Sequence, residues 1–218
     1  MMDNIKLDIP TSWDDITIGQ FVELQPVLKS DMGLIKKVNS VLSVLTGNPV
    51  DDLENVAASE NNIRAYRDIS NTLSFMNDYT NMGEVVSTFK LKGKRYALNL
   101  DIEAMDAGQY ISLMDILKKA NSNPEETINY THEIMACLIH EIKGPRFKRR
   151  AVYDELNYID TCNLFWNELP ISTAYPLTVF FCKVWEDCTK SLHESLLSQS
   201  TEIMEEVKKD LATHGVGT

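Results

Sequence analysis

The stretch Gly19-Gln20-Phe21-Val22-Glu23-Leu24-Gln25-Pro26-Val27-Leu28-Lys29 recurs as Gly108-Gln109-Tyr110-Ile111-Ser112-Leu113-Met114-Asp115-Ile116-Leu117-Lys118. Both copies fit the pattern Gly-Gln-aromatic-apolar-x-Leu-x-x-apolar-Leu-Lys without a gap. Each copy carries the spacing of a capping box, with an N-cap at Thr17 or Asp106 and a glutamine three residues later. An apolar residue before each cap and the aromatic inside the helix predict a hydrophobic staple. We therefore interpret the phrase as a helix start that an internal duplication has placed twice.

The two halves also agree beyond this phrase. Residues 41–45 lie about as far after the first copy as residues 134–138 lie after the second, and both are apolar helical stretches. A polar break at residues 77–83 is the best boundary between the halves. The sequence therefore predicts a mainly α protein, an internally duplicated helical module with a small antiparallel β-hairpin or three-stranded sheet. Residues 1–82 are the first copy, and residues 83–218 are the second copy with a C-terminal helical extension.

Apolar periodicity and stop signals predict the individual elements. A β-hairpin is expected within residues 85–100, with its turn at Lys92-Gly93, and a strand at residues 5–9 is expected to share its sheet. Pro26 is expected to kink or stop the first repeat helix near Gln25, and Trp13 to pack beneath that helix. Further helices are expected at residues 33–46, 50–57, 60–77, 123–143, 152–168, 175–197 and 201–212.

Composition sets bounds on the class of protein. The 218 residues suffice for one large or two small domains, and 44% apolar with 24% charged residues is ordinary for a globular chain. The net charge of −11 argues against a general binder of nucleic acid or of anionic membranes. No signal peptide is expected, and the longest apolar run, Leu177–Trp185, is too short to span a bilayer. No membrane association is therefore expected.

The search for reactive residues yields no catalytic, cofactor-binding or metal site. The pairs His132-Glu133 and His140-Glu141 are expected on one helix, but their separation of eight is not the zinc spacing of His-Glu-x-x-His. Cys137 and His140 are three residues apart, yet a third group to orient them is missing from the sequence pattern. The four cysteines match no zinc framework and are expected to be buried, reduced thiols: Cys137, Cys162, Cys182 and Cys188. Neither an enzyme nor a cofactor is therefore expected.

One basic run stands out in this acidic chain. Residues 143–150 hold five cations and no acid, which fits either a solvated loop after a helix C-terminus or a contact surface for an acidic partner or a phosphate backbone. The stretch 186–210, with seven acids and three bases, is a candidate counterpart on a neighbouring subunit in a head-to-tail contact of the kind that closes rings. Protein and packaged DNA both stay open as partners. The candidate contact residues are Lys143, Arg146, Phe147, Lys148, Arg149 and Arg150.

The segment Ile9–Phe21, followed by Val41–Pro49, resembles small virion and tail-assembly proteins of tailed bacteriophages, especially the crAss-like group that infects Bacteroidetes. The motif Pro-x-x-Trp-x-x-Ile-Thr-x-Gly-Gln-aromatic and a helix ending in Leu-Thr-Gly carry the resemblance. It covers roughly residues 5–77, with a weaker echo after residue 95. It implies a virion protein, assembled in the host cytoplasm, that forms an oligomeric ring or head–tail adaptor with portal and tail proteins.

Two functions from different classes remain at this point. The first is a structural ring or connector protein, present in many copies in the virion. The alternative is a tail-assembly chaperone that is absent from the mature virion. Mass spectrometry of purified particles separates the two, and the oligomeric state measured by light scattering offers a faster indication.

Overall fold

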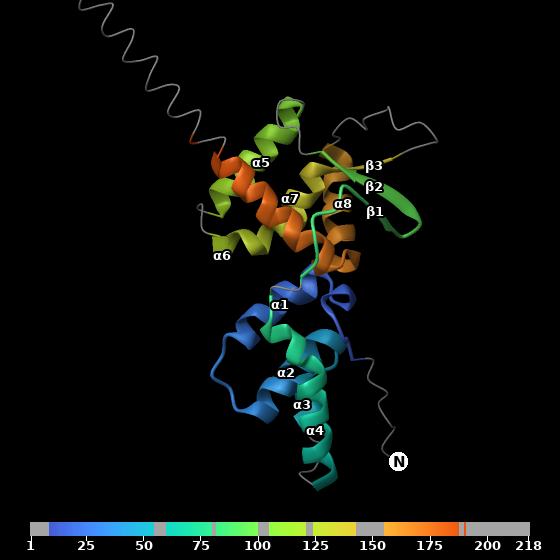
Figure 1. Cartoon of the computed structure of the whole chain (residues 1–218), viewed down its shortest axis with the longest axis vertical. Helices are drawn as coiled ribbons and strands as arrows, with labels where there is room; N and C mark the ends of the chain where they lie inside the picture. Colours follow the sequence, from blue (N-terminus) through green and yellow to red (C-terminus); the bar gives the residue numbers. More distant parts are fainter. Residues whose placement is uncertain are drawn as a thin grey trace, which may run out of the picture. The chain divides into compact units, whose positions relative to one another are not determined.

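The computed structural model describes residues 9–54, 60–79, 82–99, 105–120, 124–142, 155–187 and 190. These residues are mainly helical and include a small three-stranded antiparallel sheet, as expected (Figure 1). Contacts group Met1–Thr178 into one compact unit and Val179–Thr218 into a second. The boundary between two sequence copies at residues 82 and 83 stays a prediction.

Both predicted helix starts are confirmed. Helix α1 (Ile18–Leu28) begins at Thr17, whose hydroxyl accepts a hydrogen bond from the Gln20 N–H at 3.2 Å, while Gln20 Oε1 accepts one from the Thr17 N–H at 3.1 Å. Helix α5 (Ala107–Lys119) begins at Asp106 with the same reciprocal pair to Gln109, at 2.8 and 3.2 Å. Each box satisfies two backbone N–H groups that a helix end otherwise leaves without partners.

The two glutamines share a second role that the sequence pattern did not predict. Gln20 Nε2 donates to the carbonyl of Leu45 at 3.1 Å, next to the last residue of α2 (Leu34–Thr46). Gln109 Nε2 donates to the carbonyl of Cys137 at 2.9 Å, next to the last residue of α7 (Thr131–Leu138). Each phrase therefore ties its own helix start to the C-terminal end of a later helix.

Trp13 packs beneath α1, as expected. It lies in the 3-10 helix η1 (Trp13–Asp15) and is almost fully buried, with its ring 5.5 Å from that of Phe21. Its indole N–H donates to the carbonyl of Asp78 at 3.1 Å. Of the kink or stop expected near Gln25, the stop is wrong, because α1 continues through Pro26 to Leu28. Proline removes one N–H from the ladder, but the two residues after Pro26 still remain helical.

The start of α1 is joined to the end of α8 (Glu155–Glu168). The Ile18 N–H donates to the Leu169 carbonyl at 3.1 Å, and the Ile171 N–H donates to the Ile16 carbonyl at 2.8 Å. The indole of Trp166 lies so close to Gly19 that a Cβ built there would be 2.5 Å from its Nε1. The glycine of the first phrase is therefore required by packing between helices α1 and α8.

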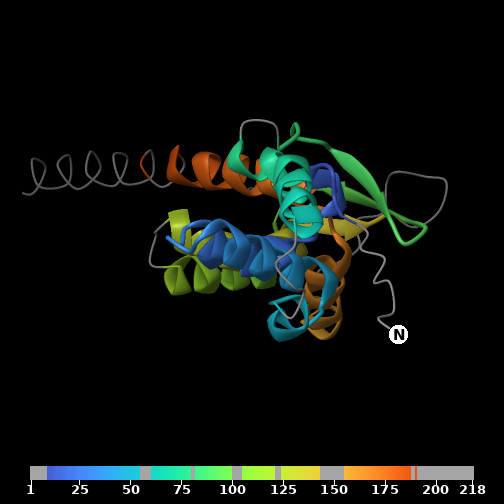
Figure 2. The ribbon, with the colours of Figure 1, turned by 90° about the horizontal axis from the view of Figure 1, so that it is seen from below.

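The first half continues with α2, α3 (Val50–Glu54) and α4 (Glu60–Thr72), followed by the 3-10 helix η2 (Leu73–Asn77). Helix α2 ends at Gly47, which has a φ of 70° and so takes the left-handed C-cap that glycine favours. Helix α1 packs against α2, and α2 packs against α4 (Figure 2). Val38, Leu42 and Leu53 form a small core between these helices, with Tyr66 packed against it.

The sheet pairs β1 (Thr88–Leu91), β2 (Lys94–Leu98) and β3 (Ile139–Glu141) in that order. Lys92 and Gly93 both have positive φ, 46° and 76°, which is the two-residue hairpin turn that the sequence predicts. The third strand corrects a prediction, because residues 139–141 were expected to be helical. They pair with β2, and the Lys94 ammonium lies 3.1 Å from the Glu141 carboxylate across the pair.

The remaining helices depart from expectation at their ends. The expected helix at 123–143 is divided into α6 (Pro124–Thr127), the 3-10 helix η4 (Ile128–Tyr130) and α7, which ends at Leu138. The helix expected from residue 175 starts at residue 171 and is described to residue 187. The predicted strand at residues 5–9, apart from Ile9, and the predicted helix at 201–212 lie outside the described residues.

Candidate functional site

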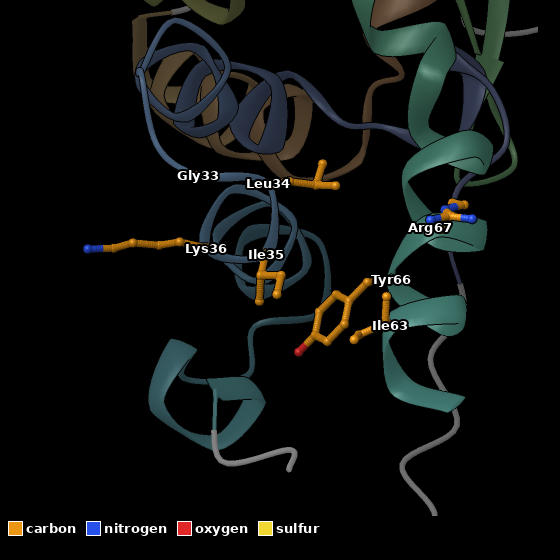
Figure 3. Close-up of a pocket in the computed structure, with 7 residues that line it drawn as sticks. All are labelled: Gly33, Leu34, Ile35, Lys36, Ile63, Tyr66 and Arg67. Carbon is orange, nitrogen blue, oxygen red and sulfur yellow. The ribbon is translucent and has the colours of Figure 1, made fainter. Parts of the chain in front are cut away.

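A groove between the N-terminal end of α2 and the middle of α4 is the main candidate site (Figure 3). We call it the α2–α4 groove. It has a volume of about 470 Å³ and is open to solvent on one side. Its lining residues are Gly33, Leu34, Ile35 and Lys36 from the start of α2, with Ile63, Tyr66 and Arg67 from α4.

The register of the two helices explains why the groove is apolar. In α2 the buried apolar positions are Val38, Val41 and Leu42, and the polar Asn39 is buried beside them. Leu34 and Ile35 precede Val38 by four and three residues, so both continue this stripe one turn towards the start of the helix, where they stay exposed. Tyr66 belongs to both the groove and the small core, because it lines the groove while its ring packs on the core. Its hydroxyl donates to the Leu53 carbonyl at 3.4 Å.

Three aliphatic side chains in this groove remain open to solvent. The exposed fractions are 59% for Leu34, 51% for Ile35 and 50% for Ile63. Single exposed apolar residues are normal on protein surfaces, but several in one concave patch are typical of a contact site. Apolar periodicity predicts helices at residues 33–46 and 60–77, but it gives no signal that Ile35 and Ile63 stay exposed in a groove.

The charge at the edge of the groove is positive. Lys36 and Arg67 lie on opposite sides of the apolar residues (Figure 3), and none of the seven lining residues is acidic. Within the part of the chain that the structure describes, neither cation forms an ion pair. The neighbouring Lys37 has a structural role instead, because its ammonium donates to the carbonyls of Leu28 and Ser30 at 2.6 and 3.2 Å.

The cysteines do not form a reactive centre in the described residues. Cys137 on α7 and Cys162 on α8 are buried, and burial raises the pKa of Cys137 to about 12 and that of Cys162 to about 11. A nucleophilic or metal-binding cysteine needs the thiolate form, which these two thiols do not reach near neutral pH. Burial is thus as predicted for Cys137 and Cys162, whereas Cys182 is only partly buried and Cys188 lies outside the described residues.

His132 and His140 are separated by the end of α7. His132 lies in α7, where its ring packs edge-on against Trp166 at 4.7 Å, and burial lowers its pKa. His140 lies in β3, so the expectation that both histidines share one helix is wrong. Cys137 and His140 likewise do not share a helix face. Over the described ranges, no three His, Cys, Asp or Glu side chains gather as a metal site would require.

The predicted basic contact run, residues 143–150, lies outside the described residues, and its role stays a prediction. Among the helices that the structure does describe, none is both long and apolar enough to cross a bilayer. No protein-family model matches the chain, and no curated protein or solved structure matches it significantly. Function is therefore inferred from the residues of this chain.

Proposed function

We propose that the protein is a non-enzymatic structural protein of a tailed-phage virion, which forms an oligomeric ring or adaptor in the neck region between portal and tail. The observation that carries the proposal is the α2–α4 groove, an exposed apolar surface with two cations at its edge. A protein that assembles with copies of itself or with neighbours needs an exposed apolar contact surface, and this groove is a candidate for one.

The residues that carry the phage resemblance support a structural role. Trp13 fills the space beneath α1, Thr17 caps that helix, and Gly19 accommodates Trp166. Gln20 closes the capping box and binds the end of α2. These side chains hold the fold together, which leaves the groove as the surface through which this part of the chain would act on a partner.

A tail-assembly chaperone is the second candidate, and the same groove favours it. A chaperone also needs an exposed apolar surface, in that case for a tail protein before assembly. The two functions differ in where the protein ends up. A ring protein stays in the particle, and a chaperone leaves it.

Quantitative mass spectrometry of purified phage particles tests the proposal. We expect this chain in a fixed ratio to the portal protein, with several copies per particle. Its absence from particles, together with its presence in infected cells, would refute the ring and support the chaperone.

We further propose that the two halves are copies of one ancestral module. The matched hydrogen bonds of Gln20 and Gln109, each to its own N-cap and to a later helix, support this duplication. Three hydrogen bonds recur at equivalent positions in the two halves, six in all. Replacing either glutamine by alanine should therefore destabilise the fold to a similar degree.

A further inference from the structure

We propose that the α2–α4 groove binds the C-terminal segment, residues 201–212, of a second copy of this chain. The inference rests on the proposed function as an oligomer, because a groove on one copy and a segment on the next form a head-to-tail contact. Such a contact repeats from copy to copy, and it closes into a ring where the rotation permits.

The groove has the form of a receptor for a helix. Its floor is formed by Leu34 and Ile35 from α2 and by Ile63 from α4, with the Tyr66 ring between them (Figure 3). An amphipathic helix that lays its apolar side on two neighbouring helices buries surface on all three. The half-exposed side chains of the groove would then become core.

The C-terminal segment has the matching sequence pattern. The helix that the sequence predicts here has four apolar residues on one side: Ile203, Met204, Val207 and Leu211. Three of them, at positions 203, 207 and 211, are spaced by four residues. A stripe of this length covers about two turns, or roughly 12 Å.

Charge favours this occupant over a neutral or basic helix. The segment places four acids around its stripe, at positions 202, 205, 206 and 210, against two lysines. Lys36 and Arg67 lie on opposite sides of the apolar floor, where they can contact the acids of a bound helix. Opposite charges at the rim select the partner and its direction, while the apolar centre supplies the affinity.

A small-molecule ligand fits the groove less well. Sites for such ligands combine apolar walls with a few convergent polar groups. Here the Tyr66 hydroxyl already donates to the Leu53 carbonyl, and the only charged groups lie at the ends of long side chains. A helical protein segment needs only the apolar floor and the charged rim.

Peptide binding to the full-length chain tests the contact. The probe is a fluorescent peptide of residues 198–214, and the receptor is the chain carrying Val207→Asp, so that its own segment does not compete. We expect saturable binding by fluorescence anisotropy. Ile35→Asp or Ile63→Asp in the receptor should weaken it at least about tenfold, because each places a carboxylate in the apolar floor.

Matched controls separate this effect from misfolding. Ile159→Asp places the same charge at an aliphatic residue that is 65% exposed on α8 and does not line the groove, so it should leave binding unchanged. Lys36→Glu combined with Arg67→Glu should weaken binding, and a peptide with Glu205→Lys and Glu206→Lys should restore it. Absent binding, or equal binding to the Ile35, Ile63 and Ile159 variants, would overturn the proposal.

A mixing experiment tests whether the contact forms between copies. The Ile35→Asp chain lacks a working groove and the Val207→Asp chain lacks a working segment, so each alone should stay monomeric. At a concentration above the measured peptide Kd, an equal mixture should form dimers, seen by light scattering. A mixture that stays monomeric would show that the segment does not bind a second copy.

These results are independent of the test of the virion role. Failure of peptide binding would reject this contact and leave the ring to be judged by particle composition. Binding by a protein that is absent from particles would retain the contact and reject the ring.

Discussion

Gly19→Ala is the substitution that most directly tests how the first phrase holds the fold. The added methyl would lie 2.5 Å from Nε1 of Trp166 and 2.8 Å from its Cε2. Ordinary contacts between non-bonded heavy atoms begin near about 3.5 Å. The indole cannot simply rotate away without losing its edge-on contact with the His132 ring, whose centroid is 4.7 Å from that of Trp166.

The expected net effect follows from two opposing contributions. Inserting a methyl into a packed contact costs about 1–3 kcal/mol. Replacing glycine by alanine inside a helix returns at most about 1 kcal/mol. Gly19→Ala should therefore destabilise the protein by about 1 kcal/mol. Gly108→Ala, at the same helix position in α5 but exposed, should be neutral or stabilising. The two variants should differ by about 2 kcal/mol, or about 4–8 °C in Tm for a chain of this size.

Urea and thermal unfolding followed by circular dichroism measure this difference. A Trp166→Ala background provides the decisive comparison, because it removes the ring that the methyl would meet. In that background Gly19→Ala should no longer destabilise, which gives a coupling of about 1–2 kcal/mol between the two positions. Equal stability of the Gly19→Ala and Gly108→Ala variants, or a coupling near zero, would refute the packing explanation.

Three further predictions follow from the described side chains. Gln20→Ala and Gln109→Ala should each lower the free energy of unfolding by about 1–3 kcal/mol, because each removes two hydrogen bonds of a helix end, and denaturant titration checks this. Cys137 and Cys162 should resist alkylation by iodoacetamide at pH 8 unless the chain is unfolded. Burial raises their pKa values from 9.0 to about 12 and about 11. The free energy of unfolding should therefore fall as the pH rises above 9, where only the unfolded thiols ionise. The lowered pKa of His132 acts in the opposite direction. Stability should fall as the pH drops below 6.5, because the unfolded chain then binds a proton that the folded chain does not. His132→Asn should reduce this pH dependence when Tm is measured against pH.

Helix starts and tight turns could be predicted because their chemistry is local. The capping boxes at Thr17 and Asp106 need only residues three positions apart, and the structure forms both. The same holds for Lys92-Gly93, since a two-residue hairpin turn needs positive φ at both positions and glycine supplies one of them at little cost. Such signals do not depend on the rest of the fold.

The elements that the sequence did not predict depend on distant partners. Residues 139–141 lie in a stretch whose apolar periodicity predicts a helix. They form β3 instead, because the edge of β2 can pair with them. The Lys94–Glu141 ion pair adds to this pairing, although both side chains are partly exposed and its contribution is small. Periodicity within one segment does not show which of two hydrogen-bonded arrangements a neighbouring strand will favour.

The α2–α4 groove was missed for a related reason. The sequence indicates that α2 and α4 are amphipathic, but it does not indicate which part of each apolar face the other helix covers. Val38 and Leu42 are covered, whereas Leu34 and Ile35 extend beyond the contact. A groove of this kind arises from the offset between two helices, which is a property of their packing.

The comparison of the two phrases shows which residue has the same role in both. Phe21 is fully buried but Tyr110 is 44% exposed, and Gly19 lies against Trp166 whereas Gly108 is exposed. The glutamine repeats its contacts in both copies, to its own N-cap and to the end of a later helix.

For the first copy that later helix is α2, whose opposite end forms one wall of the α2–α4 groove. The end at Gly33 has no side-chain cap, so the bond from Gln20 to Leu45 is one of the contacts that fix the position of α2. Gln20→Ala should therefore weaken binding of the 198–214 peptide several-fold, while Gln109→Ala, with a similar loss of stability, should leave it unchanged. Equal weakening by the two variants would mean that general stability, and not the placement of α2, controls the groove.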